Sequence, residues 1–178
     1  PHPERSGLFL AMNINKRGIT LDIATNTGKE ILFRLIEWAD ILIENQRPKV
    51  MRNLGIDYSV VSKLKSSLIV TSISPFGQSG PYQDYDAEDL VSFHMGGYGY
   101  YLGGTVNDPR AEPPLKAAER QSEFLAAVHG ALATMGAVFA RGLSGKGQHV
   151  DVSQQEAVMA SLGRITRTTP EKGRESRG

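Results

Sequence analysis

The stretch ILIENQRPKVMRNLG, residues 41–55, carries residue types that suit the binding of an anion. Its apolar start ends directly in an acid, two amides and an arginine, and Pro48 then favours the first position of a short helix. A helix N-terminus combined with guanidinium groups suits phosphate. The cations expected to face a phosphorylated ligand are Arg47, Lys49 and Arg52. An alternative is purely structural, with Asn45 capping the helix and Arg47 in solvent.

The composition narrows the chemistry further. None of the 178 residues is a cysteine, which excludes disulfides, thiolate metal sites and a cysteine nucleophile. The histidines show no metal-ligand spacing, so no metal is expected: His2, His94, His129 and His149. The net charge of +1 predicts neither nucleic acid nor an anionic membrane as a partner. The first residues lack the pattern of a signal peptide, and we expect a cytoplasmic protein.

The elements that must position these residues alternate between strand and helix. Strands are expected at Arg17–Ile23, 40–45 and Leu68–Ser74. Helices are expected at Thr25–Ala39 and, behind an Asp57 cap, at 57–66. This alternation predicts an α/β fold with an open parallel, Rossmann-like sheet and helices on both faces.

Beyond Ser74 the pattern changes. A Gly/Pro loop leads to a short helix near residues 87–93 and to the glycine-rich, aromatic stretch GGYGYYLGG, 96–104, which fits either a mobile lid or an ordered surface loop. A long helix is expected from Ser122 to Arg141, then a strand in SGKGQHVDVS, a helix in QQEAVMASLG and a disordered tail. Phe124–Ala140 carries no charge, but it is shorter than the ~20 residues of a membrane span. It is predicted to be a buried helix.

Three stretches resemble the class III CoA-transferases, the CaiB/BaiF family that includes formyl-CoA and carnitine CoA-transferases and α-methylacyl-CoA racemases. They are NINKRGITLDI, ADILIENQRP…LGIDYSVVSKLKSSLIVTSISPFGQSGPY and LSGKGQHVDVSQQEAVMA. Their order and spacing run from about Phe9 to Gly163, which makes the combination specific.

The resemblance implies an organisation. Residues 1–114 are expected to be part of a CoA-binding α/β large domain, 115–163 to lead toward a small domain, and 164–178 to be disordered. Family members are longer and form interlocked homodimers, so this sequence is expected to be a central fragment and a homodimer.

The resemblance also implies a binding site for coenzyme A. Lys16 or Arg17 would contact the nucleotide phosphates, and Asn45, Gln46 and Arg47 the pantetheine and adenine side. The family often has an arginine where this chain has Asn53. Arg52 stands one residue earlier, where a helix points it in another direction.

The family nucleophile is an aspartate at the start of the long helix, a position that Glu123 occupies here. Ser122 would cap the helix, which places the carboxylate at its first position. Glutamate is one methylene longer than aspartate, and a shift of about 1 Å can cost ~100-fold. Asp89 matches a second acidic position near the reaction centre, and the base that precedes it in racemases is Glu88 here.

The resemblance therefore predicts an acyl-CoA:carboxylate CoA-transferase that works through an enzyme carboxylate, with an acyl-CoA and a small carboxylic acid as its substrates. Two alternatives stay open. One is a racemase or isomerase of the same superfamily, which Glu88 disfavours because racemisation needs a base on each face of the α-carbon. The other is a non-catalytic CoA-binding or assembly fragment.

Overall fold

Three parallel strands form the sheet in the computed structural model, which describes residues 6–99, 108, 111–112, 115 and 117–163. The strands β1 (Ile41–Glu44), β2 (Ile69–Ser74) and β3 (His149–Ser153) lie in the order β1-β2-β3. All pairs are parallel, so their carboxyl ends meet at one edge of the sheet. The predicted parallel α/β sheet is confirmed.

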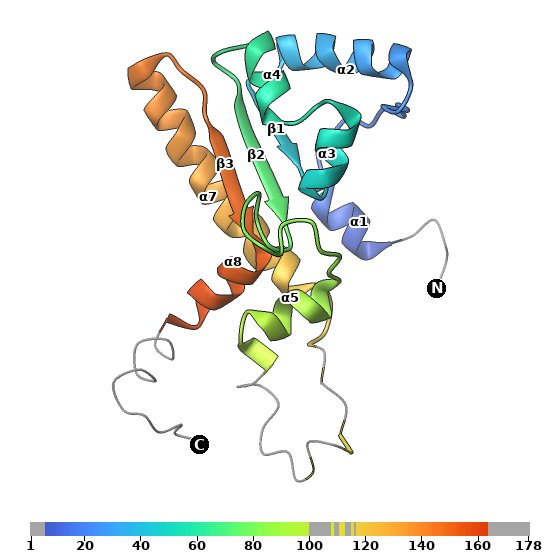
Figure 1. Cartoon of the computed structure of the whole chain (residues 1–178), viewed down its shortest axis with the longest axis vertical. Coiled ribbons are helices and arrows are strands. Elements are labelled where there is room, and N and C mark those ends of the chain that lie inside the picture. The colour runs from blue at the N-terminus through green and yellow to red at the C-terminus, as the bar shows by residue number, and fades with distance from the viewer. Residues whose placement is uncertain (1–5, 100–107, 109–110, 113–114, 116, 164–178) are drawn as a thin grey trace.

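Three helices cover one face of the sheet: α2 (Asn26–Trp38), α3 (Pro48–Leu54) and α4 (Tyr58–Leu64) (Figure 1). They share a core with the strands, in which Ile36, Met51, Val61 and Val70 are buried. The starts of α2 and α4 are capped as their sequences predict. The Thr25 hydroxyl accepts from the Gly28 amide (3.1 Å), and the Asp57 carboxylate accepts from the Ser59 amide (2.9 Å).

The other face is covered by α7 (Gln121–Ser144), which connects β2 to β3 and packs against both. The shorter helices α5 (Asp89–Met95) and α8 (Gln154–Ser161) pack against each other and against α7 beyond the carboxyl edge (Figure 1).

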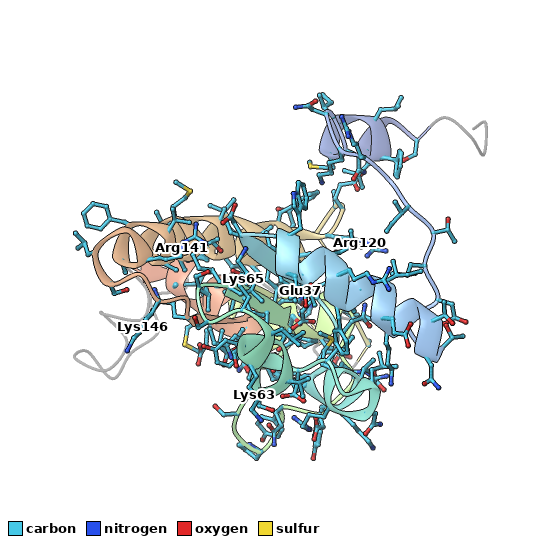
Figure 2. The ribbon with its side chains drawn as sticks, turned by 90° about the horizontal axis from the view of Figure 1, so that it is seen from above. Glu37, Lys63, Lys65, Arg120, Arg141 and Lys146 are labelled. Atoms are coloured by element: carbon cyan, nitrogen blue, oxygen red, sulfur yellow. The ribbon has the colours of Figure 1, made fainter. Side chains whose placement is uncertain are left out.

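The direction of α7 decides where its first residues lie. Near its C-terminus, Arg141 donates to the backbone oxygens of Asp40 (3.1 Å) and Ser67 (3.2 Å), which precede β1 and β2. Figure 2 shows Arg141 and Arg120 at opposite ends of this helix. A helix of 24 residues is about 36 Å long, whereas a strand of 6 residues spans only about 20 Å. The N-terminus of α7 therefore extends past the carboxyl edge of the sheet.

The long helix is not buried on all sides, which corrects the prediction for Phe124–Ala140. Small residues face the sheet at helical spacing: Ala126, Gly130, Thr134 and Ala137. Large apolar residues point outward, among them Leu132 and Phe139 at 73% and 74% exposure. By length and composition alone, α7 is also long and apolar enough to cross a membrane. Of its apolar 18-residue stretch, 22% is buried in the structure.

Close contact explains why the small residues face inward. The Thr134 and Thr71 hydroxyls are 2.6 Å apart, and a Cβ added to Gly130 would lie 3.1 Å from the Ile73 side chain. The helix backbone thus lies too close to β2 for a leucine or phenylalanine at these positions.

The strand expected at Arg17–Ile23 is absent, and the prediction is wrong there. The segment joins α1 (Gly7–Met12) to α2 without ladder bonds, and Ile19 is exposed. Alternating β-branched residues form a strand only where a neighbouring strand accepts their hydrogen bonds. Among the described residues, β1 pairs only with β2. Most of the glycine-rich stretch, from Tyr100 onward, and the predicted disordered tail lie outside the described residues.

Candidate functional site

Glu123 lies in the first turn of α7, beyond the carboxyl edge of the sheet. The helix begins at Gln121, so Glu123 is the third helical residue and not the first. Both carboxylate oxygens accept from the Arg120 guanidinium, at 3.1 and 3.2 Å. The Glu123 side chain keeps 40% of its surface exposed. The free N–H groups of a helix start favour a carboxylate at this position.

Arg120 forms an ion pair with Glu123, and two further carboxylates lie near it. The hydrogen bond to Glu123 raises the pKa of Arg120, and the nearby carboxylates of Glu88 and Asp89 act in the same direction. Glu88 itself is exposed at the residue before α5 and makes no side-chain capping bond. Glu88, the acid at the position of the racemase base, therefore lies near enough to Arg120 to interact with its charge.

Ser122 does not cap α7, which corrects the prediction of its role. The capping position belongs to Arg120, whose side chain makes no capping bond. Ser122 is fully buried instead, and both its backbone N–H (2.8 Å) and its hydroxyl donate to Oδ1 of Asp89. Asp89, the second predicted catalytic acid, is itself only 6% exposed. The two predicted acids are thus joined through Ser122, although they are far apart in the sequence.

The predicted CoA corner follows β1, at the same edge of the sheet. Glu44 accepts from the Gln46 backbone N–H (2.7 Å), which turns the chain toward α3. Arg47 immediately precedes α3, and Asn45 does not cap this helix. The Arg47 guanidinium forms a solvent-exposed ion pair with Asp86 from the loop after β2. The structural alternative is therefore wrong about the Asn45 cap, whereas Arg47 does remain exposed to solvent, in an ion pair.

The other predicted cations fall into two groups. Arg52 forms two hydrogen bonds with Asp84, at 2.7 and 2.8 Å, so the loop after β2 is tied to α3 twice. Lys49 is exposed on the same helix. Lys16 and Arg17 are exposed in the connection between α1 and α2, where Lys16 donates to the Asn13 side chain (3.3 Å). Both figures place α1 at the side of the molecule, apart from the sheet.

A row of polar side chains across the sheet was not predicted. The Ser72 hydroxyl lies 2.9 Å from Nε2 of His149, and Glu44 also hydrogen-bonds Ser72. The Tyr58 ring stacks on His149 with 4.5 Å between ring centres. The three strands each carry polar residues in the sequence, but only the register places Glu44 opposite Ser72, and His149 opposite Val70 on the same face as Ser72.

Burial shifts the titration of this row. It raises the pKa of Glu44, an effect that the hydrogen bonds from Ser72 and the Gln46 amide oppose. It lowers the pKa of His149 below its ordinary 6.5, while the nearby Asp151 carboxylate acts in the opposite direction. Relative to the unfolded chain, burial therefore shifts both groups toward their neutral forms.

We expect His149 to make the fold less stable in acid. The unfolded chain takes up a proton near pH 6.5, whereas the folded imidazole resists it, so stability falls as the pH drops from 6.5 toward the lowered value. The slope should stay below the one-proton limit of about 1.4 kcal/mol per pH unit, because the ring is only partly buried.

Urea denaturation at several pH values between 7.5 and 5.5 measures this slope. His149→Gln keeps a polar group for Ser72 but does not titrate, so its curve should be flatter than that of the parent. Comparing the two proteins cancels the contribution of Glu44 to first order. Equal slopes would show that His149 does not carry the acid sensitivity.

An open pocket of 350 Å³ lies elsewhere, between α7 and the β3–α8 segment. Its lining includes His129 and Leu132 from α7 and Glu156 from α8, and none of the predicted site residues. Nδ1 of His129 donates to the Leu125 carbonyl of its own helix, one turn earlier (2.9 Å). The pocket borders the exposed apolar side of α7.

Known proteins resemble the whole chain in sequence. The profile of CoA-transferase family III matches residues 1–178. Succinyl-CoA:(R)-benzylsuccinate CoA-transferase subunit BbsE from Thauera aromatica is 33% identical over all 178 residues, which correspond to 42% of that protein. A formyl-CoA:oxalate CoA-transferase from Afipia carboxidovorans is 35% identical over 88% of this chain and 36% of its own length. The chain thus spans about two fifths of the curated relatives it matches.

Solved structures agree with the fold. A CaiB/BaiF family protein from Brucella suis superposes with a TM-score of 0.78 and 28% identity, over 91% of this chain and 42% of that one. Rv3272 from Mycobacterium tuberculosis shares the fold with a TM-score of 0.76 at 22% identity, over 88% of this chain and 42% of its own. Because the family profile covers every residue and the architecture agrees, this chain belongs to CoA-transferase family III.

Proposed function

We propose that this chain supplies the acyl-accepting carboxylate and part of the CoA site of an acyl-CoA:carboxylate CoA-transferase. The observation that carries the proposal is the accessible carboxylate of Glu123 at the start of α7. It lies beyond the same edge of the sheet that the Gln46–Arg47 corner follows, in a chain of a CoA-transferase family. In parallel sheets, ligands bind at this edge because loops and helix N-termini converge there.

The reaction needs a carboxylate that accepts an acyl group and then CoA. Glu123 attacks the donor thioester carbonyl, the C–S bond breaks, CoA leaves as the thiolate, and a mixed anhydride between the donor acyl group and Glu123 remains. The thiolate attacks the Glu123 carbonyl of the anhydride, which releases the donor acid and leaves CoA on Glu123 as a thioester. The acceptor carboxylate repeats the sequence in reverse, so that acyl-CoA departs and Glu123 is regenerated.

Arg120 has a defined part in this scheme. Its two hydrogen bonds orient the Glu123 carboxylate, and a carboxylate is the nucleophile that the first step requires. The same bonds occupy both oxygens, so one must open before attack. Because the pair is solvent-exposed, it opens readily.

We assign CoA phosphate contact to Arg47 and propose that Arg47→Ala weakens CoA binding roughly 10-fold, the loss for one charge-assisted hydrogen bond. Isothermal titration with CoA at moderate salt measures the effect. Arg34→Ala is the matched control, since it removes an exposed arginine from α2 and lowers the net charge equally. Equal affinities in both variants would leave Arg47 with its structural role, the ion pair to Asp86.

A second candidate function is a non-catalytic CoA-binding or assembly subunit. Two observations favour considering it: the name of the Thauera aromatica relative describes a subunit, and a Chloroflexus aurantiacus relative, 28% identical, is named a beta subunit. Glutamate in place of aspartate fits either function. We propose association through the exposed side of α7 in both cases, as a homodimer or with a complementing subunit.

Trapping separates the two candidates. The protein is incubated with a panel of acyl-CoA donors, treated with hydroxylamine or borohydride, and digested for mass spectrometry. A transferase gives one modified peptide, at Glu123, and transfers CoA to an added carboxylic acid. CoA binding without a modified Glu123 and without transfer would establish the assembly subunit instead.

A further inference from the structure

A buried contact joins the start of α5 to the start of α7. Asp89, the first residue of α5, accepts through Oδ1 from the Ser122 backbone N–H (2.8 Å) and from the Ser122 hydroxyl. The hydroxyl also lies 3.3 Å from the Asp89 carbonyl. Both residues are buried, Asp89 at 6% and Ser122 at 0% exposure.

This contact replaces the missing cap of α7. The first N–H groups of a helix have no partner within the helix, and a capping side chain normally satisfies one of them. The residue before α7, Arg120, provides no such bond. Asp89 supplies it from another helix by accepting the N–H of the second helical residue.

Contacts between α5 and α8 fix the position of α5. The Ser92 hydroxyl of α5 donates to the Gln154 side chain of α8 (3.1 Å). Gly96 at the end of α5 lies so close to Val158 that an added Cβ would clash with it, at 2.4 Å. The position of Asp89 is therefore fixed by α8, and α8 continues directly from β3.

We propose that Asp89 is a positioning residue, which fixes the first turn of α7 and through Ser122 the place of the Glu123 carboxylate. Glu123 follows Ser122 directly, and among the described residues its side chain bonds to the exposed Arg120 alone. A displacement of about 1 Å at a reacting group can cost ~100-fold in rate. The catalytic consequence rests on the proposed function of Glu123, whereas the cap itself does not.

The burial of Asp89 argues for positioning over contact with substrate. Oδ1 is engaged by Ser122, and Oδ2 is buried with no hydrogen-bond partner among the described residues. Asp89 therefore offers almost no accessible surface to a substrate. The resemblance to the family implies that this acid lies near the reaction centre. Its role as the cap of α7 explains this position without requiring Asp89 to transfer a proton.

Two substitutions at Asp89 separate the roles. In Asp89→Asn the amide oxygen still accepts both Ser122 bonds, while the charge and any proton transfer are lost. Asp89→Ala removes the acceptor, and Ser122→Ala removes only the hydroxyl donor, which provides a milder variant if Asp89→Ala fails to fold. Glu30→Ala, an exposed acid on α2, is the control for loss of charge.

Hydrogen–deuterium exchange of the 178-residue chain tests the cap without any activity. In Asp89→Ala the Ser122 amide should exchange at least about 10-fold faster because its acceptor is gone, and the neighbouring amides of residues 121–124 should follow as the first turn frays. In Asp89→Asn and Glu30→Ala they should stay close to the parent, with Ser122→Ala in between. Unchanged exchange in Asp89→Ala would overturn the proposal.

Transfer kinetics in the active assembly test the consequence. Asp89→Ala should lower kcat about 100-fold with KM for acyl-CoA unchanged, and Asp89→Asn should restore most of it with the parent pH profile. If Asn loses as much as Ala, or removes one limb of the pH profile, Asp89 takes part in the chemistry and positioning is refuted. Transfer that persists in Glu123→Gln would refute the proposed function alone, because the exchange result does not depend on Glu123.

Discussion

Glu123→Gln is expected to abolish CoA transfer and to leave CoA binding and the fold intact. An amide cannot attack a thioester, so the loss should be on the order of 10⁴-fold or more, as for removal of other catalytic nucleophiles. The fold should tolerate the change because the side chain is exposed and its pair with Arg120 is a surface contact. Transfer rate, CoA affinity and thermal unfolding are measured on one preparation.

Glu156→Gln is the matched control for this experiment. It makes the same chemical change at an exposed acid in the first turn of another helix, α8. Transfer should continue in the control, with Glu123 still modified by hydroxylamine after incubation with acyl-CoA. Activity in Glu123→Gln equal to that of the control would remove Glu123 from the mechanism.

Glu123→Asp tests how the site uses the longer side chain. Asp restores the residue usual in the resembling family but withdraws the carboxylate by about one methylene, and the two bonds from Arg120 must then lengthen or break. A site adapted to glutamate should lose roughly 100-fold in rate. A gain in rate would instead indicate that the site keeps the geometry of an aspartate enzyme.

The exposed side of α7 should drive association. Its large apolar side chains follow one stripe and are each at least 64% exposed: Val128, Leu132, Met135, Phe139 and Leu143. Contiguous apolar surface of this kind is typical of interfaces. We expect the chain to sediment as a dimer, or as a complex with a complementing subunit, at micromolar concentration.

The double variant Leu132→Glu/Phe139→Glu should weaken this association by about 100-fold or more, because two charges would have to be desolvated in the interface. Trp38→Glu is the control, since Trp38 is 85% exposed but lies at the end of α2. A parent protein that sediments as a monomer, or a double variant that associates as the parent does, would contradict the role of α7.

The sequence determined much of the fold through local signals. The apolar periods and the capping residues Thr25 and Asp57 predict α2 and α4, and the apolar runs predict β1 and β2. These signals suffice because a cap and a helical period involve residues only three or four positions apart. The segment Arg17–Ile23 marks the limit, since its alternating pattern requires a partner strand that no local signal provides.

The site residues came from the family resemblance, but their arrangement needed the tertiary structure. The sequence singles out Glu123, Asp89 and Arg52. It does not reveal that Asp89 holds Ser122 from 33 residues away or that Asp84 holds Arg52 from 32 residues away. Such contacts join helices and loops that only the packing of the sheet brings together.

The orientation of α7 is the clearest case of a feature that the tertiary structure decided. Its sequence carries a large apolar stripe and a small-residue stripe at the same helical period, and hydrophobicity alone would bury the large one. The structure buries the small one, with Gly130 and Thr134 against β2. The reason is distance: a helix lying this close to a strand has room for glycine, alanine and threonine, and the larger side chains must face away from the sheet.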